Sequence, residues 1–336
     1  GDVYKRQERT CPMPLQLLFV ADPLDDFKIV KDSTFAMMRE AARRGHVIRA
    51  CEPRQIRWQR GGTVRSVMRT IELTGSDNDW YRVVDESERE LAAQDAVIMR
   101  KDPPFDAEYF YATHLLGQAE REGAKEFNRP AALRDHPEKL AILEFPQHIA
   151  PTLVTREAAA VRAFHAEHRD IILMPLDGLG GMGIFRVGPD GLNLGSIVET
   201  LNRDGATTLM VQKYLPEIVQ GDKRILVIAG RPMPFSLARI PQGSEIRGNL
   251  AAGGKGVAQP LTEADRRIAE ALGPVLAARG LLLVGLDVIG ECLTEINVTS
   301  PTCFQEIEQQ TGFPVAATFI DALEAAVDAS DAPARA

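Results

Sequence analysis

The segment Val284–Val298, VGLDVIGECLTEINV, predicts two successive strands that carry polar side chains inside apolar runs. Asp287 interrupts the first run, and Glu295 and Asn297 stand two apart in the second, so these two side chains project from one face. A charge in an apolar strand is costly unless it meets a cation or a partner. Two carboxylates and an amide oxygen suit Mg²⁺ held jointly with phosphates, although a pair of solvated strand carboxylates is the alternative.

A glycine-rich segment, Asp177–Gly183 (DGLGGMG), lies between the strand-like runs DIILMPL (170–176) and IFRVG (184–188). Glycines let backbone N–H groups turn toward an anion without hindrance from a Cβ atom. The segment lacks the GxxxxGK[ST] pattern, and no helix follows it as a dinucleotide fingerprint requires. We therefore predict an antiparallel hairpin whose tip covers phosphates, with an ordinary hairpin tip as the alternative.

Basic residues gather around a second glycine-rich segment, PQGSEIRGNLAAGGKG (241–256). Arginine forks suit carboxylates and phosphates. A mobile loop edged by cations is typical of a lid over an anionic substrate, whereas a plain linker would not be bounded so closely by regular structure. The basic set is Arg224, Arg239, Arg247 and Lys255.

The two halves of the chain differ in their predicted architecture. In the first half, strand-like runs (15–21, 46–51 and 95–100) alternate with helical ones (32–45 and 107–122), which favours a parallel sheet covered by helices. A hairpin-like insertion is expected over 59–73. The second half is dominated by antiparallel strands, with a hairpin turn at Ala229-Gly230, a helix over 263–279 and a closing helix near 315–327.

Composition restricts the partners and the compartment. The net charge of −8 argues against a nucleic-acid partner, and no apolar run is long enough to span a membrane. The start of the chain is too polar for a secretory signal, so a cytoplasmic protein is expected. The cysteines show no metal-ligand spacing and are interpreted as isolated thiols, Cys303 as a structural one; they are Cys11, Cys51, Cys292 and Cys303.

Taken together, these segments resemble the bacterial-type glutathione synthetases, which have the ATP-grasp fold. The similarity runs from about residue 15 to the C-terminal helix, and its most specific parts are RKDPPFD (100–106) and RGNLAAGG (247–254). It also includes KDSTFAMM, LRDHPEKL, IILMPLDGLGG, GDKRILV, VGLDVIG and LTEINVTSPT.

The resemblance implies an N-terminal parallel-sheet domain, Rossmann-like (preATP-grasp), followed by an ATP-grasp domain with antiparallel sheets. We expect a substrate-binding domain over 13–130 and the ATP-grasp domain over 131–330, divided into a central or lid part (131–215) and a catalytic part (216–330). Residues 1–12 look foreign to the rest, so we expect the natural chain to begin at Met13.

The resemblance also implies a role for each matching residue. Asp287, Glu295 and Asn297 match metal ligands, and Arg224, Arg239 and Arg247 match residues around the forming acyl phosphate. Arg100, Asp102, Gly248 and Asn249, with Arg239 and Arg247, are expected to contact the dipeptide substrate. The nucleotide set is Lys139, Met174, Gly180, Gly181, Gln212, Lys213, Tyr214, Leu215 and Asp222.

The implied reaction joins glycine to γ-glutamylcysteine through an acyl phosphate, with ATP as co-substrate and Mg²⁺ or Mn²⁺ as the cofactor. A homo-oligomer, a tetramer, and small-molecule substrates are the implied partners. Two alternatives remain: another ATP-grasp carboxylate–amine ligase, and a nucleotide-binding protein of reduced activity. The first should not combine RKDPPFD with RGNLAAGG.

Met174 departs from the family pattern, which has lysine at this position to contact the ATP phosphates. Methionine offers neither charge nor donor. Losing one charge-assisted contact should weaken nucleotide binding about ten- to a hundredfold. Genuine divergence and a single-base sequence error explain the methionine equally well.

Overall fold

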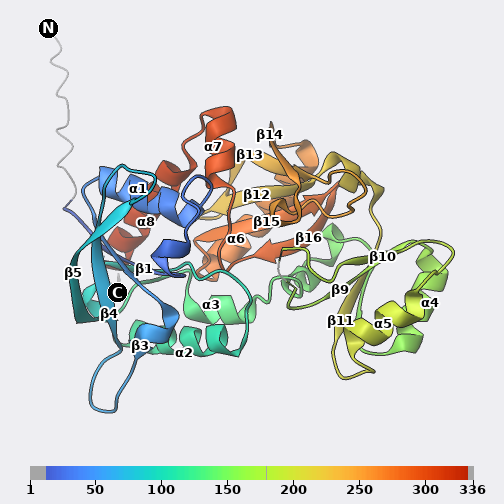
Figure 1. The fold of residues 1–336 in the computed structure, drawn as a ribbon, viewed down its shortest axis with the longest axis horizontal. Coiled ribbons are helices and arrows are strands. Elements are labelled where there is room, and N and C mark those ends of the chain that lie inside the picture. Colours follow the sequence, from blue (N-terminus) through green and yellow to red (C-terminus); the bar gives the residue numbers. More distant parts are fainter. Residues whose placement is uncertain (1–12, 179, 332–336) are drawn as a thin grey trace, which may run out of the picture.

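The computed structural model describes residues 13–178 and 180–331. The expected non-native segment, residues 1–12, lies outside this range. The described chain forms three sheets, which Figure 1 shows with sheet A at the left, sheet C at the centre and sheet B at the lower right. Among the described residues, no helix combines the length and apolar character that crossing a membrane requires.

Sheet A has seven strands, in the order β3-β4-β2-β1-β6-β7 with β5 paired to β4. Its centre is parallel as predicted, because β1 pairs with β2 and β6, and β6 pairs with β7, all in parallel. The flank is antiparallel, so the prediction of a parallel sheet holds only for the centre. The strands are β1 (Gln16–Val20), β2 (Val47–Cys51), β3 (Ile56–Arg57), β4 (Arg65–Leu73), β5 (Tyr81–Glu90), β6 (Ala96–Met99) and β7 (Glu126–Phe127).

The antiparallel flank of sheet A corrects the hairpin expected over 59–73. The long hairpin is formed by β4 and β5. Across the Gly61-Gly62 turn, β4 pairs with the two-residue strand β3. The helices of this region are α1 (Ser33–Arg43), α2 (Ala107–Arg121) and α3 (Pro130–Asp135). Asp32 caps α1 by accepting a hydrogen bond from the Phe35 amide (2.7 Å), which fixes where the β1–α1 connection ends.

Sheet B is antiparallel, with the order β10-β9-β11-β8. Its strands are β8 (Thr152–Thr155), β9 (Ile171–Pro175), β10 (Phe185–Val187) and β11 (Leu209–Lys213), with helices α4 (Ala158–His168) and α5 (Leu194–Asn202). A small core containing Val161 and Val198 joins the two helices to the buried residues Leu173 and Val211 on one face of the sheet. The other face is thereby left for contacts with the rest of the molecule.

Sheet C is antiparallel, with the order β14-β13-β12-β15-β16. Ile225 and Val227 of β12 pack with α6, while Leu226 and Ile228, on the opposite face, join the core that contains α8. The elements are β12 (Asp222–Ile228), β13 (Arg231–Ile240), β14 (Lys255–Pro260), β15 (Leu283–Ile289), β16 (Cys292–Asn297), α6 (Glu263–Ala278), α7 (Phe304–Thr311) and α8 (Val315–Asp331).

Short 3₁₀ turns connect several of these elements. They are η1 (Leu24–Asp26), η2 (Pro53–Gln55), η3 (Leu91–Ala93), η4 (Ala141–Glu144), η5 (Pro146–His148), η6 (Pro216–Gln220) and η7 (Leu250–Ala252).

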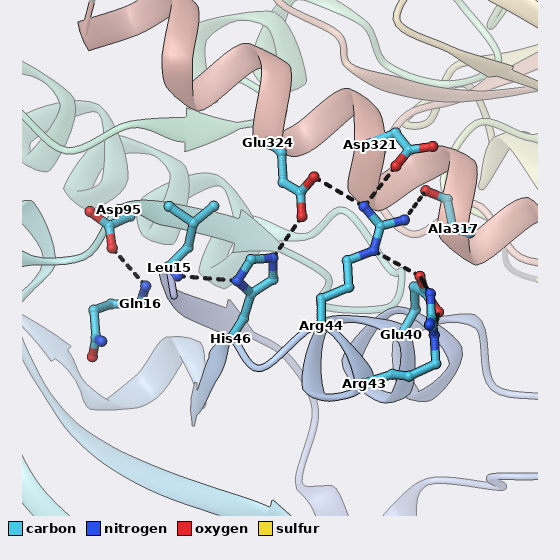
Figure 2. A network of polar contacts seen from close by, with 10 residues as sticks. All are labelled: Leu15, Gln16, Glu40, Arg43, Arg44, His46, Asp95, Ala317, Asp321 and Glu324. Carbon is cyan, nitrogen blue, oxygen red and sulfur yellow. Dashed lines mark hydrogen bonds and ion pairs between the residues drawn. The ribbon is translucent and has the colours of Figure 1, made fainter. Parts of the chain in front are cut away.

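The last helix, α8, is bound to the first elements of the chain by the polar network in Figure 2. Arg44 donates to Asp321 (2.7 Å), to Glu324 (3.0 Å) and to the Ala317 carbonyl (3.0 Å). His46 Nδ1 accepts from the Leu15 amide (3.1 Å), so its Nε2 carries the proton and donates to Glu324 (2.8 Å). The C-terminal helix therefore packs on α1 as well as on β12 of sheet C.

Candidate active site

A cavity of about 550 Å³ lies between sheets B and C and extends to the β1–α1 connection. Of the described residues predicted to form the site, all but Arg100 and Lys255 line it. They are Asp102, Lys139, Met174, Gly180, Gly181, Gln212, Lys213, Tyr214, Leu215, Asp222, Arg224, Arg239, Arg247, Gly248, Asn249, Asp287, Glu295 and Asn297. Segments far apart in the chain therefore meet in one space, as the sequence predicted.

Arg100 lies behind the cavity wall. Its buried guanidinium donates to Thr34 Oγ1 (3.0 Å) and to the Pro301 carbonyl (2.9 Å). These bonds join β6 to α1 and to the segment after β16. The arrangement favours a role in holding these connections and gives no support to the expected contact with substrate.

Charged side chains form a row across one face of sheet C. Arg224 and Asp287 are direct cross-strand partners, and Asp287 is in turn opposite Glu295. Arg224 donates to both oxygens of Asp287 (2.5 and 3.0 Å), and Arg239 approaches the same carboxylate at 2.8 Å. Gly285 makes room for this pairing, because a Cβ atom there would lie 2.8 Å from Arg224 Cδ.

The two guanidiniums determine the charge of Asp287. Burial alone would raise its pKa, but Arg224 and Arg239 more than offset that effect and hold the pKa well below its ordinary range. Asp222 differs, because burial raises its pKa to about 7 although Arg239 donates to it at 2.5 Å. Its Oδ1 atom is buried without a partner among the described residues.

The predicted metal ligands come together with oxygens suited to a divalent cation. Asp287 and Glu295 face each other across β15 and β16, and Asn297 lies two residues further on the same strand. Within the described chain, no three His, Cys, Asp or Glu side chains gather into a metal cage. A site of two carboxylates and one amide oxygen completed by substrate phosphates fits this geometry and is usual for Mg²⁺.

Lys139 lies at the same end of the cavity. Its ammonium donates to Glu295 (3.0 Å) and to the Gly178 carbonyl (3.1 Å), so it joins β16 to the glycine hairpin. The neighbouring Glu138 accepts from the amides of Val298 and Thr299 (3.0 and 3.1 Å). These bonds fix the segment that follows β16.

Met174 occupies the position that the sequence predicted. It lies in β9 opposite Met210 of β11, lines the cavity, and is only 8% exposed. Ile172, two residues earlier, lines the same wall. This part of the wall is therefore apolar where the family pattern has an ammonium group.

The two glycine-rich loops meet over the cavity. Arg247 donates to the Gly181 carbonyl at 3.2 Å, and a Cβ atom at Gly181 would lie 2.6 Å from Asn249 Oδ1. Gly181 also has a φ of +84°, a backbone conformation that favours glycine. The hairpin of sheet B and the predicted lid of sheet C are thus in direct contact.

Sequence reasoning missed part of the lining. These residues belong to the β1–α1 connection and to the segment after Asn297, and they are Lys28, Lys31, Asp32, Ser300, Thr302, Cys303 and Glu306. Asp32 was expected only as the first residue of the helical segment 32–45, and Cys303 only as a structural thiol. The polar run TSPT after a metal-ligand strand was the available signal.

Comparisons with known proteins agree with this arrangement. The model of the prokaryotic glutathione synthetase N-terminal domain matches residues 15–134, and that of the ATP-grasp domain matches residues 138–312. A glutathione synthetase of Ralstonia nicotianae is 61% identical over 312 residues, covering 93% of this chain and 96% of its own. One of Neisseria meningitidis serogroup B is 56% identical over 315 residues, with 93% and 98% covered.

Solved structures are similar at the level of the fold. The D-cycloserine synthetase DcsG has a TM-score of 0.66 at 15% identity, with 93% of this chain and 99% of that chain covered. The ATP-grasp ligase PsnB, complexed with minimal precursor, Mg and ADP, has a TM-score of 0.61 at 17% identity, with 93% and 98% covered. Since the matching domain models span both the sheet A region and the cavity between sheets B and C, this chain belongs to the prokaryotic glutathione synthetase family.

Proposed function

We propose that the chain joins glycine to γ-glutamylcysteine with ATP, giving glutathione, ADP and phosphate. The γ-phosphoryl group passes to the cysteinyl carboxylate, and the glycine amine then displaces phosphate from the acyl phosphate. The observation that carries this proposal is the single cavity shared by the glycine hairpin, the lid and the paired guanidiniums of sheet C. Such a cavity can hold a nucleotide and an anionic acceptor side by side.

Arg224 and Arg239 are the groups proposed to stabilise negative charge in both steps. Their orientation is fixed before substrate arrives, because Asp287 and Asp222 hold them. Preorganised donors are most effective in a site that excludes water. The contact between Arg247 and the hairpin supports a lid that keeps water from the acyl phosphate.

A divalent cation would be held by Asp287, Glu295 and Asn297 together with the phosphates. When bound, it supplies neutralisation of the charge that moves to the leaving oxygen. Lys139 pairs with Glu295 and therefore lies at the end of the cavity where the phosphates would bind. We propose Mg²⁺ as the cation, with Mn²⁺ able to replace it.

Met174 favours a second candidate, a nucleotide-binding protein of reduced activity. The cavity wall is apolar at this residue, and Lys139 remains nearby as a cation. ATP binding is therefore expected to be weakened and not abolished.

A phosphate-release assay with ATP, Mg²⁺ and γ-glutamylcysteine, run with and without glycine, separates the candidates. Glycine-dependent phosphate release with formation of glutathione is the expected result. Phosphate release with D-alanine but not with γ-glutamylcysteine would identify another ligase. ADP binding without turnover would identify the nucleotide-binding protein.

The compartment, the oligomeric state and the domain division follow from the family resemblance and are proposals as well. We propose a cytoplasmic homo-tetramer, which size-exclusion chromatography with light scattering tests. The proposed division places residues 13–130 in a substrate-binding domain and residues 131–330 in the ATP-grasp domain. Packing crosses that division, since α8 contacts α1.

A further inference from the structure

Arg186 lies at the open edge of sheet B, on the face that borders the cavity. It is the cross-strand partner of Ile172, which is in turn opposite Gln212, and both of these residues line the cavity. Cross-strand partners project from the same face of a sheet. Arg186 therefore stands at the end of a row of residues that leads along the cavity wall.

The Arg186 guanidinium covers the ring of Tyr214. Its Cζ atom lies 3.7 Å from the ring centroid, and Tyr214 itself lines the cavity. A cation over an aromatic face is attracted by the negative charge of that face. Arg186 thus supports Tyr214 although it does not itself line the cavity.

Asp170 holds both members of this stack. Its carboxylate accepts two hydrogen bonds from Arg186 (3.0 and 2.7 Å), which fixes the guanidinium plane. Its backbone carbonyl accepts from the Tyr214 amide (2.9 Å). The three residues form one unit that fixes both the backbone and the ring of Tyr214.

We propose that Arg186 is a positioning residue for the base of a purine nucleotide, acting through Tyr214. This inference rests on the proposed function, since Tyr214 belongs to the segment 212–215 expected to bind the nucleotide. A half-exposed ion pair contributes little to stability by itself. The stack instead keeps a flat aromatic ring at a constant place in the wall, where a flat base would bind.

The test measures base-dependent binding. Arg186→Ala should raise the Kd for ADP and the KM for ATP about two- to tenfold, with kcat and the KM for γ-glutamylcysteine unchanged. Inorganic tripolyphosphate, which has no base, should inhibit both proteins equally. Arg186→Lys should fall between them, because it keeps the cation but loses the two-point contact with Asp170.

Two controls make the outcome specific. Arg82→Ala removes a similar exposed ion pair, with Glu72 on sheet A, and should leave all these constants unchanged. Tyr214→Leu should weaken ADP binding as Arg186→Ala does, and the double variant should be no weaker than either single one. The proposal would be overturned if Arg186→Ala left the Kd for ADP unchanged, or if the effects of the two substitutions on that Kd added in the double variant. It would also be overturned if Arg186→Ala weakened inhibition by tripolyphosphate as much as it weakened ADP binding. A wild-type protein that binds ADP but forms no glutathione would refute the proposed function and leave this test intact.

Discussion

Arg224 and Arg239 illustrate how single residues prepare the cavity for an anion. Both are buried, and their partners are Asp287, which stays ionised, and Asp222, whose pKa is raised to about 7. Truncating one member of a buried pair leaves the other charge uncompensated. The carboxylates of sheet C thus offset part of the free-energy cost of burying these two cations, and an anionic substrate would offset the rest.

Met174→Lys should lower the KM for ATP about ten- to a hundredfold, the value of one charge-assisted phosphate contact. Since Met174 is 8% exposed and packs with a hydrophobic core, the variant should also lose about 1 kcal/mol of stability. Steady-state kinetics and thermal unfolding measure the two effects. Met174→Gln is the uncharged control and should leave the KM high. A KM that stays the same in Met174→Lys would mean that another cation already fills the role.

Glu126 makes stability depend on pH. It is 3% exposed, neither carboxylate oxygen has a partner among the described residues, and burial raises its pKa well above the ordinary value. The folded state therefore binds more protons than the unfolded state, and the unfolding free energy falls as pH rises above about 4.5. Glu126→Gln should stabilise the protein more at pH 7 than at pH 4, because at pH 4 the carboxyl group is protonated in both the folded and the unfolded state. Urea unfolding at both pH values measures the change in unfolding free energy. An equal change at both pH values would show that the Glu126 carboxyl group does not titrate as inferred.

At the scale of the element, local pattern predicted most strands but only four of the eight α-helices that the described residues form. The elements that it missed include β5, β8, β14, α3, α4, α5 and α7. β5 has the sequence YRVVDESERE, and most of its residues are exposed, so it shows no apolar alternation. Its pairing with β4 is supported by cross-strand ion pairs such as Arg69–Glu86 and Arg82–Glu72. These contacts depend on the partner strand, which a scan for hydrophobic periodicity does not consider.

The network that holds α8 gives a test with two neighbouring arginines. Arg44 is 17% exposed and binds Glu40, Asp321 and Glu324, whereas Arg43 is 70% exposed and, among the described residues, binds only Glu40. Arg44→Met should cost about 2–3 kcal/mol, because it leaves several charged acceptors unpaired. Arg43→Met should cost less than about 1 kcal/mol. Denaturant unfolding compares them, and equal losses would show that the network does not hold the helix.

The lid should respond to ligands as one element. Protease should cut between Gly243 and Gly256 in the free protein, and ATP with substrate should protect this segment. Gly181→Ala should weaken the protection, because the new Cβ would lie 2.6 Å from Asn249 Oδ1 in the lid. Gly243→Ala is the control, since Gly243 also has a positive φ (+61°, against +84° at Gly181) but its Cβ would meet no atom of the described residues within 4 Å. Cleavage that is indifferent to ligands would remove the lid role.

At the scale of the whole molecule, the sequence predicted the centre of the cavity better than its far end. The strands proposed to hold the metal and both glycine loops are continuous motifs, so their residues could be identified without a structure. Lys28 and Lys31 reach the cavity because α1 packs on α7, which in turn packs on β13 and β14 of sheet C, and no local pattern specifies these contacts. Arg100 is the opposite case, a residue that the sequence placed in the site and the structure does not. Its motif was recognised, but its hydrogen-bond partners, Thr34 and Pro301, are remote in sequence.

Because the cavity is built by elements from both halves of the chain, ligands should stabilise the molecule as a whole. ADP at a hundred times its Kd should add about 2.7 kcal/mol, which raises the melting temperature by several degrees. Mg²⁺ should increase this shift, and EDTA should remove only the metal-dependent part. Glu295→Gln keeps an oxygen acceptor for Lys139 but loses one charged metal ligand. It should therefore retain the shift from ADP, lose the added shift from Mg²⁺, and turn over orders of magnitude more slowly. Repeating the titration with Mn²⁺ compares the two cations directly. If Glu295→Gln kept the full Mg²⁺-dependent shift and an unchanged kcat, Glu295 would not be a metal ligand, and its role would be limited to the ion pair with Lys139.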